Sequence, residues 1–478
     1  MNETTGMNEN PLAILPEVLL AAGAVLALLL GSWLPRHRQW PARLTAASAA
    51  AGGIAAAAVQ AAADSPTTAF GGAFAIDPVT TAARVVILAA TLLLIALAAA
   101  PARGHPRESE YYVLLQLAAL GALMLAGAND LLLLAAAYLL AGVPSYALAA
   151  FAKNGPGTEA ALKFYVLGAL LGVLMLAGIT VLHAAGRATA YGTLRAGLPQ
   201  APEALVAAGL VALLAGLLFK AGAVPGHFWV PDAVQGSTPQ VAALLTTLPK
   251  AGALAALYRL ATEPLAGTTV PWPGLLAVLA AASMTLGNLA AFFQQDVTRL
   301  LAYSTISQVG YLLMPIAVAG RSGLAQQALL YYLAAYALTN LGAFAVVCAL
   351  PRARAPADYR GLARTRPALA ASLAVCLLGL VGTPPTAVFL GKLEAFGAAI
   401  DGGYAWLAVV AAANTVASLF YYLRWLAPAL APAAPPRHTP IAAPEPAAAV
   451  AACAAAGGSL LLGVLGGPLL ALLDGPAS

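Results

Sequence analysis

Apolar segments of roughly 20 residues follow one another along nearly the whole chain, and short polar or charged stretches separate them. A helix of about 20 apolar residues is long enough to cross the hydrocarbon core of a bilayer. The pattern therefore predicts an all-α polytopic membrane protein with about fourteen transmembrane helices. The expected spans are 12–34, 43–63, 79–100, 111–128, 130–151, 160–184, 204–224, 238–262, 273–293, 298–319, 325–350, 368–396, 404–426 and 446–473.

Glycine and proline interrupt two of these segments, each time close to a lysine. The first interruption places Gly222 and Pro225 after Lys220, and the second places Pro384 before Lys392. Because proline cannot donate a backbone hydrogen bond, it leaves carbonyl groups free inside a helix. Both segments are therefore predicted to be broken helices.

The two breaks also suggest an internal repeat. Pro225 and Pro384 are 159 positions apart, and the helices that begin near positions 111 and 273 have a similar offset. Five helices per unit would invert the second unit relative to the first, an arrangement in which paired broken helices mark the transport site. The expected divisions are an N-terminal three-helix segment (1–110), a first repeat (111–262), a second inverted repeat (263–428) and a C-terminal helix (429–478).

Hydrophobic residues make up 61% of the chain and charged residues 9%, which excludes a water-soluble globule of this size. With both termini outside, the inner loops hold fourteen basic residues and the outer loops three. Because cytoplasmic loops are enriched in Lys and Arg, this bias predicts a bacterial inner-membrane protein with both termini on the outer side. The net charge of +5 then reflects loop arginines and not a nucleic-acid partner. The inner basic residues are Arg36, Arg38, Arg43, Arg103, Arg107, Lys153, Arg299, Arg352, Arg354, Arg360, Arg364, Arg366, Arg424 and Arg437, and the outer ones are Arg187, Arg195 and Arg321.

Six basic residues remain, and all lie in the apolar segments. Arg84 and Arg259 are expected to reach the membrane surface from near a helix end. The other four are lysines, which can lose their proton when buried, whereas arginine keeps it. A charge at the bilayer centre costs roughly 2.5–3.5 kcal/mol on insertion scales, so Lys220, Lys250 and Lys392 are candidate proton carriers. The alternative is that each lysine only binds free carbonyls and holds a broken helix in place.

Four stretches carry a resemblance to a known family: residues 220–240 (KAGAVPGHFWVPDAVQGSTPQ), 296–312 (DVTRLLAYSTISQVGYL), 358–367 (DYRGLARTRP) and 382–396 (GTPPTAVFLGKLEAF). The chain resembles the antiporter-like subunits of respiratory complex I, and among them the N-subunit family of NADH-quinone oxidoreductase. The resemblance implies a membrane-arm subunit that binds no cofactor and moves protons. NADH, FMN, iron–sulfur clusters and quinone are then expected in partner subunits, and the neighbours are other membrane-arm subunits and the lipid bilayer.

The resemblance also implies roles for particular residues. Lys220 matches the central lysine of the broken seventh helix, Lys250 the connecting lysine of the eighth and Lys392 the terminal lysine of the broken twelfth. His227 lies just past the first break and is a candidate relay or helix cap. Lys163 and Glu159, one turn apart, match a charged pair at the start of the sixth helix, although Lys163 is also close enough to the surface to extend into it.

Three positions depart from the family pattern. The family has a glutamate in the fifth helix five residues before a proline, and counting back from Pro144 reaches Leu139. Gln308 stands where histidine is common, and it can bind water but cannot titrate. Pro249 directly precedes Lys250, where a small polar residue is usual. The chain thus keeps the lysines and lacks the acid expected to act on Lys220.

These observations lead to three hypotheses. The first is a proton-translocating membrane subunit of an NADH-quinone oxidoreductase, which relays protons along Lys163, Lys220, Lys250 and Lys392. The second is a diverged scaffold subunit of the same complex, suggested by Leu139. The third is a subunit of a multi-component cation/proton antiporter or of a membrane-bound hydrogenase, which neighbouring genes for hydrophilic NADH-dehydrogenase subunits would exclude.

Overall fold

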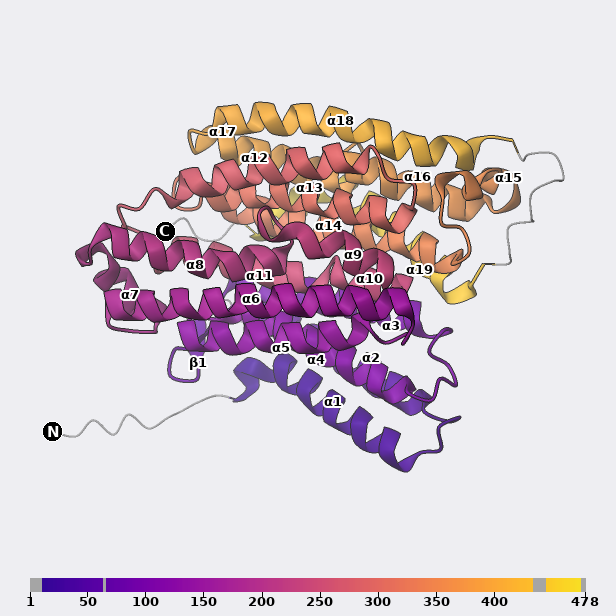
Figure 1. Ribbon diagram of the computed structural model, residues 1–478, viewed down its shortest axis with the longest axis horizontal. Coiled ribbons are helices and arrows are strands. Elements are labelled where there is room, and N and C mark those ends of the chain that lie inside the picture. The colour runs from indigo at the N-terminus through magenta and orange to yellow at the C-terminus, as the bar shows by residue number, and fades with distance from the viewer. Residues whose placement is uncertain (1–10, 63–65, 433–443, 474–478) are drawn as a thin grey trace.

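The computed structural model describes residues 11–62, 66–432 and 444–473, and this part of the chain is almost entirely helical. Most of the long helices run side by side in roughly one direction, and together the helices form a single bundle (Figure 1). Within the described ranges, 13 helices are long and apolar enough to cross a membrane. The prediction of an all-α polytopic membrane protein is confirmed.

The elements follow the predicted spans in order. The N-terminal part contains η1 (Pro11–Ile14), α1 (Leu15–Trp33), α2 (Trp40–Ala62), β1 (Thr67–Ala69), β2 (Phe74–Ile76), α3 (Pro78–Ala98) and α4 (Glu108–Gly127). The middle part contains α5 (Leu131–Ala149), α6 (Gly155–Gly186), α7 (Tyr191–Gly197), η2 (Leu198–Gln200), α8 (Glu203–Ala221), η3 (Gly226–Phe228), α9 (Trp229–Gly236), α10 (Pro239–Leu245) and α11 (Leu248–Thr262). The last part contains α12 (Trp272–Ala291), α13 (Val297–Ala317), α14 (Ala325–Ala349), η4 (Pro356–Tyr359), α15 (Leu362–Thr365), α16 (Pro367–Val381), α17 (Ala387–Asp401), α18 (Ala405–Leu430), α19 (Pro446–Val464) and α20 (Gly466–Leu473).

The twelfth predicted helix is present as a pair of half-helices. The span expected over 368–396 is occupied by α16 and α17, each of 15 residues and each too short to cross a bilayer alone. The span expected over 238–262 is also divided, into α10 and α11. Pro249 has no N–H to donate to the carbonyl of Leu245, and a new helix begins at Leu248.

Several short elements were not predicted from the sequence, and two of them lie in loops between long helices. One is α7, a helix of seven residues in the loop after α6. The other is the antiparallel hairpin of β1 and β2, in which Thr67 pairs with Ile76 and Ala69 with Phe74. Both are shorter than the apolar periodicity that reveals a membrane helix, so hydropathy does not detect them.

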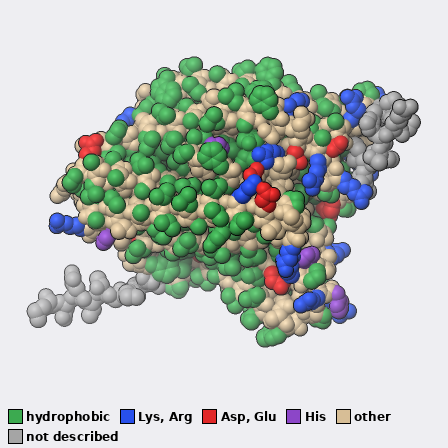
Figure 2. Space-filling model, viewed as in Figure 1, with side chains coloured by type: hydrophobic (Ala, Val, Ile, Leu, Met, Phe, Trp, Pro, Cys, Tyr) green, Lys and Arg blue, Asp and Glu red, His purple; other side chains and the backbone are tan. Residues whose placement is uncertain are grey.

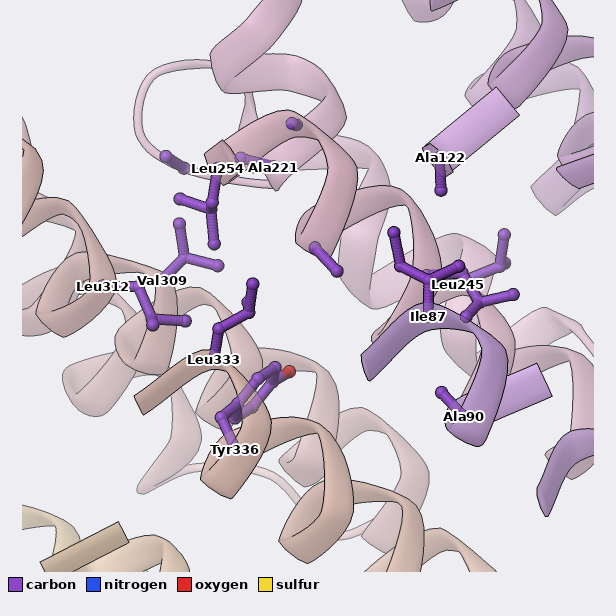
Figure 3. Packing of buried hydrophobic residues seen from close by; sticks show 14 of the residues in the cluster. Ile87, Ala90, Ala122, Ala221, Leu245, Leu254, Val309, Leu312, Leu333 and Tyr336 are labelled. Atoms are coloured by element: carbon purple, nitrogen blue, oxygen red, sulfur yellow. The ribbon is translucent and has the colours of Figure 1, made fainter. Parts of the chain in front are cut away.

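The centre of the bundle is formed by the middle of the chain. The apolar window of the segment Pro239–Thr262 is 100% buried inside the protein, whereas only 33% of the α6 window is. Figure 3 shows side chains from four elements pointing into one interior: Ala221 of α8, Leu254 of α11, Val309 of α13 and Leu333 of α14. The helices that carry Lys250 and Gln308 are therefore surrounded by protein.

The predictions for Arg84 and Arg259 are wrong, because neither residue reaches the surface. Arg84 is fully buried and forms an ion pair with Glu17 of α1 at 2.7 Å. Arg259 is buried and pairs with Asp77, just before α3, at 2.6 Å. Burial alone would raise the pKa of Asp77, but the Arg259 guanidinium outweighs burial and lowers it. Each acid satisfies an arginine that would otherwise have to extend to the membrane surface.

Basic side chains gather at one end of the bundle. Figure 2 shows most blue side chains at the end where α15 and its neighbouring loops lie, and few at the opposite end. This distribution agrees with the unequal charge of the two sets of loops, while the side of the membrane that each end faces stays a prediction. Arg437 and both ends of the chain lie outside the described residues.

Candidate functional site

The first break lies where α8 ends. Gly222 follows with φ +74°, a left-handed conformation that favours glycine, and the chain continues through η3 into α9. The carbonyls freed by this turn accept side-chain hydrogen bonds. Lys250 Nζ donates to Ala221 O at 2.7 Å, and Trp229 Nε1 donates to Phe219 O at 2.8 Å. The break therefore exposes acceptors that the buried lysine of α11 uses.

The second break repeats this geometry at the end of α16. Gly382 has φ +92°, and Lys392 Nζ donates to Val381 O, the carbonyl before that glycine, at 2.8 Å. Lys392 also donates to Thr415 Oγ1 at 3.2 Å and lies over the ring of Tyr311 at 4.0 Å. Both predicted broken helices are thus present, and at each of them a buried ammonium binds the last carbonyl of the first half-helix.

Lys220 has different surroundings. Its side chain is buried, yet Nζ has no hydrogen-bond or ion-pair partner among the residues that the structure describes. Two aromatic rings of α5 lie close to it, because Nζ is 4.3 Å from the ring centre of Tyr138 and 5.8 Å from that of Tyr146. Leu139, the position where the family has a glutamate, is 52% exposed. The central lysine is therefore buried without an acid.

Two groups of hydrogen-bonded polar side chains lie near the breaks, one at Thr246 between α10 and α11 and the other at the second break. Asn340 Nδ2 donates to Thr246 Oγ1 at 3.0 Å, and Tyr336 Oη donates to Thr246 O at 2.8 Å. Gln308 is buried, donates to the carbonyl of Leu380 at 2.8 Å and accepts from Tyr332 Oη at 2.6 Å. Tyr332, Tyr336 and Asn340 were not singled out from the sequence, although polar residues inside an apolar span are the signal that could have revealed them.

Lys163 lies apart from the three buried lysines. It is 48% exposed and pairs with Glu159 at 2.8 Å and with Asp232 of α9 at 3.1 Å. Asp232 also accepts from Arg299 at 2.9 Å, so the predicted pair is part of a four-residue charged cluster. Figure 2 shows red and blue side chains interrupting the apolar face over α9 and the nearby end of α6.

His227 lies in η3, between the end of α8 and the start of α9. Its ring is half-buried and packs against that of Phe228 with a centroid distance of 4.4 Å. Pro225 and Pro384 lie at the surface of the isolated chain, beside their breaks. The structure thus brings Lys220, Lys250 and His227 to the first break and Lys392 and Gln308 to the second.

The number of hydrogen bonds distinguishes the three buried lysines. Lys392 donates two and Lys250 one, so both fit the alternative of a lysine that holds a broken helix through a free carbonyl. Lys220 fits that alternative poorly, because it binds no carbonyl in the described chain. A buried amine with so few fixed partners can gain or lose a proton without breaking a hydrogen bond.

Comparison with known proteins shows which family the chain belongs to. The family model described as "NADH:quinone oxidoreductase/Mrp antiporter, TM" matches residues 128–418. NADH-quinone oxidoreductase subunit N 1 of Streptomyces griseus is 53% identical over 89% of this chain and 90% of its own length. Subunit N of Mycobacterium sp. (strain JLS) is 52% identical over 97% of this chain and 98% of its own.

Solved structures agree with these relatives. A chain of respiratory complex I from Thermus thermophilus, solved with bound aureothin, is 34% identical, with a TM-score of 0.83 over 96% of this chain and 100% of that one. A chain of the Mrp complex from Dietzia sp. is 22% identical with a TM-score of 0.84, a likeness that shows the fold alone. The resemblance drawn from the sequence motifs is confirmed, and the chain belongs to the NADH-quinone oxidoreductase subunit N family.

Proposed function

We propose that this chain is a membrane-arm subunit of a proton-pumping NADH-quinone oxidoreductase and that its buried lysines move the protons. Electron transfer from NADH through FMN and iron–sulfur clusters to quinone then takes place in partner subunits. The chain contributes to the enzyme as a proton-translocating subunit without a redox site of its own. It spans a bacterial cell membrane, with both termini on the outer side and other membrane-arm subunits as neighbours.

One observation carries this proposal, namely the surroundings of Lys220. A buried ammonium is costly in a membrane and normally has a partner that compensates it. Lys220 has neither a hydrogen bond nor an ion pair in the described part of the chain. A lysine that held the fold together would need such a bond. A lysine that exchanges protons needs instead an environment in which the charged and neutral forms are both accessible.

The proposed path runs along the two breaks. Lys250 binds the carbonyl of Ala221, the residue next to Lys220 in the chain, so both lysines belong to the first break. From there the hydrogen-bonded side chains of α13 and α14 lead to Gln308 and on to Lys392. We infer that bound water bridges the intervals between these groups. Lys163, with Glu159, would exchange protons at the inner surface, and His227 would assist at the first break.

Substitution of the central lysine tests the proposal. Lys220→Ala should abolish most of the NADH-driven proton uptake by vesicles that contain the assembled complex, because the proposed relay passes through the Lys220 amine and alanine cannot carry a proton. The matched control is Lys153→Ala, since Lys153 is the one lysine of the chain outside the apolar segments and is exposed. Proton uptake would be measured against the rate of quinone reduction, and assembly by native electrophoresis.

A second candidate function is that of a scaffold subunit that keeps the fold but does not pump. It is favoured by Leu139, which leaves α5 without the family acid, and by the carbonyl bonds of Lys250 and Lys392, which are sufficient to hold the breaks. The same experiment separates the two functions. Proton uptake that is unchanged in an assembled Lys220→Ala complex would support the scaffold and exclude the proposed relay through Lys220.

A further inference from the structure

Three residues of α5 face Lys220 at a regular spacing. Tyr138, Gly142 and Tyr146 are four positions apart, so they lie on one face of the helix. A Cβ atom at position 142 would lie 3.0 Å from Lys220 Nζ and 3.2 Å from Tyr146 Oη. Gly142 thus leaves the space that the ammonium occupies, and the two rings lie on either side of it. Leu139 belongs to a different face and is exposed.

Gly168 of α6 also contributes to this arrangement. A Cβ there would collide with Tyr146 Oη, so the absence of a side chain lets this ring lie against α6. The backbone carbonyl of Gly168 accepts a hydrogen bond from Tyr138 Oη at 3.3 Å. Because the hydroxyl of Tyr138 is engaged there, its ring face is the part that lies towards Lys220.

Comparison of the three buried lysines indicates what the rings do. Lys392 has two hydrogen bonds and one ring, and Lys250 has one hydrogen bond and the ring of Trp229 at 5.8 Å. Lys220 has two rings and no hydrogen bond in the described chain. The negative faces of aromatic rings attract cations, and the attraction is strongest where water is excluded. Aromatic faces are thus the main described stabilisation of the Lys220 ammonium.

We propose that Tyr138 and Tyr146 are positioning residues that hold the ammonium form of Lys220 with their ring faces, in place of the carboxylate that α5 lacks. The inference rests on the proposed proton relay through Lys220 and adds what stabilises its charged state. A ring attracts the cation without accepting its proton. Lys220 can therefore pass its proton onward, and the rings cannot capture it.

Other titratable groups occur on the elements that pack against α8. These are Glu159, Lys163, Tyr165 and His183 on α6, Lys250, Tyr258 and Arg259 on α11, and His227 on η3. No hydrogen bond or ion pair joins any of them to Lys220 within the described residues. Tyr146 also packs edge-on against Phe164, with a centroid distance of 4.6 Å, so its ring has a packing role as well. An experiment must therefore change the electrostatics of a ring and keep its shape.

Fluorinated phenylalanines at position 138 meet this requirement. Tyr138→Phe keeps the ring face, and phenylalanines with one, two or three fluorine atoms weaken its negative potential stepwise at nearly constant size. A weaker ring favours the ammonium less, so Lys220 should lose its proton at a lower pH. The alkaline limb of the pH profile of NADH-driven proton uptake should move down with each fluorine, by the order of one pH unit across the series.

The same series at Tyr165 is the control, because this ring contacts Tyr146 but has no described contact with Lys220. Its pH profile should not move. Tyr138→Leu should lose most proton uptake, and Tyr138→Phe should retain it. If Tyr138→Leu fails to assemble, the fluorinated series still tests the role of the ring face. An unchanged alkaline limb in complexes that Lys220→Ala inactivates would overturn this inference and leave the relay intact. Full pumping by Lys220→Ala would instead overturn the relay itself.

Discussion

The position of Lys250 depends on a single missing side chain. Gly222 adopts φ +74°, and a Cβ atom there would overlap Lys250 Nζ and also contact Val230. An alanine would therefore add two separate penalties. The first is the left-handed backbone, which disfavours any residue with a Cβ by roughly 1–2 kcal/mol. The second is displacement of the ammonium from the carbonyl of Ala221.

We expect Gly222→Ala to reduce NADH-driven proton uptake several-fold and to lower the temperature at which the complex dissociates. Gly267→Ala separates the two penalties, because Gly267 has φ +83° with no atom within 4 Å of the added methyl group. The control should show only the small loss of stability due to the backbone. Equal proton uptake in the two variants would mean that the place of Lys250 is unimportant for pumping.

The lysines of the site were predictable from the sequence, but the partners of Lys220 were not. Lysines in apolar segments are rare and stand out in any hydropathy pattern. The spacing of Tyr138, Gly142 and Tyr146 is equally visible, yet it shows only that these residues share a face. Which face of α5 meets α8 is decided by packing, in which Gly142 and Gly168 make the necessary room. The resemblance singled out Leu139 as the position of the family glutamate, although its side chain is exposed and faces away from the bundle.

Among the elements, two buried ion pairs connect parts of the chain far apart in sequence. Arg84 of α3 binds both carboxylate oxygens of Glu17 on α1 and also Gln60 on α2. Arg259 of α11 binds both oxygens of Asp77 and thereby ties the central segment to the start of α3. The first pair joins the N-terminal helices to one another, and the second attaches them to the body of the subunit. The sequence did not reveal either role.

Removal of one partner of the Arg84–Glu17 pair should be far worse than loss of both charges. Arg84→Met leaves a buried carboxylate alone, which is expected to destabilise the subunit by about 3–5 kcal/mol. The double variant Glu17→Gln with Arg84→Met should recover much of this loss. The temperature at which the subunit leaves the detergent-solubilised complex, followed on native gels, measures the effect.

An exposed pair provides the comparison. Arg195 and Glu263 lie 3.6 Å apart at the surface, where Arg195→Met should cost less than about 1 kcal/mol. If Arg84→Met were no more harmful than Arg195→Met, the pair on α1 and α3 would not hold the N-terminal helices in place.

At the scale of the element, hydropathy predicted the long helices but not where they are interrupted. The breaks at Gly222 and Gly382 were expected because glycine and proline occur there together. The division of α10 from α11 was missed because Pro249 lies alone in an otherwise helical stretch, in which many membrane helices only bend. The hairpin of β1 and β2 is too short for any periodic pattern.

For the whole molecule, the unequal distribution of basic residues predicts its orientation. Gly155 is the first residue of α6 and lies at the end of the bundle that is expected to face the cytoplasm. Gly192 lies in α7, at the end that is expected to face the outside of the cell. Neither would meet another atom within 4 Å if it carried a side chain. In intact cells a membrane-impermeant maleimide should label Gly192→Cys and not Gly155→Cys. The two buried native cysteines, Cys348 and Cys376, should remain unlabelled.

Labelling of Gly155→Cys in preference to Gly192→Cys would show that the protein has the opposite orientation. A background variant in which Cys453 is replaced by alanine serves both measurements, because that cysteine is exposed on the surface of α19. Permeabilised cells should label both new cysteines, which verifies that each variant is present and reactive.

The burial of the central segment has a consequence for how the bilayer can influence this protein. Every residue in the apolar window of Pro239–Thr262 is buried inside the chain, whereas α1, α2, α6 and α19 have only about a third of their windows buried. A bilayer that is too thick or too thin acts on helices through hydrophobic mismatch at lipid contacts. Changes in acyl-chain length should therefore tilt these four outer helices first. Lys250 should respond only when their tilt displaces the buried helices beside them.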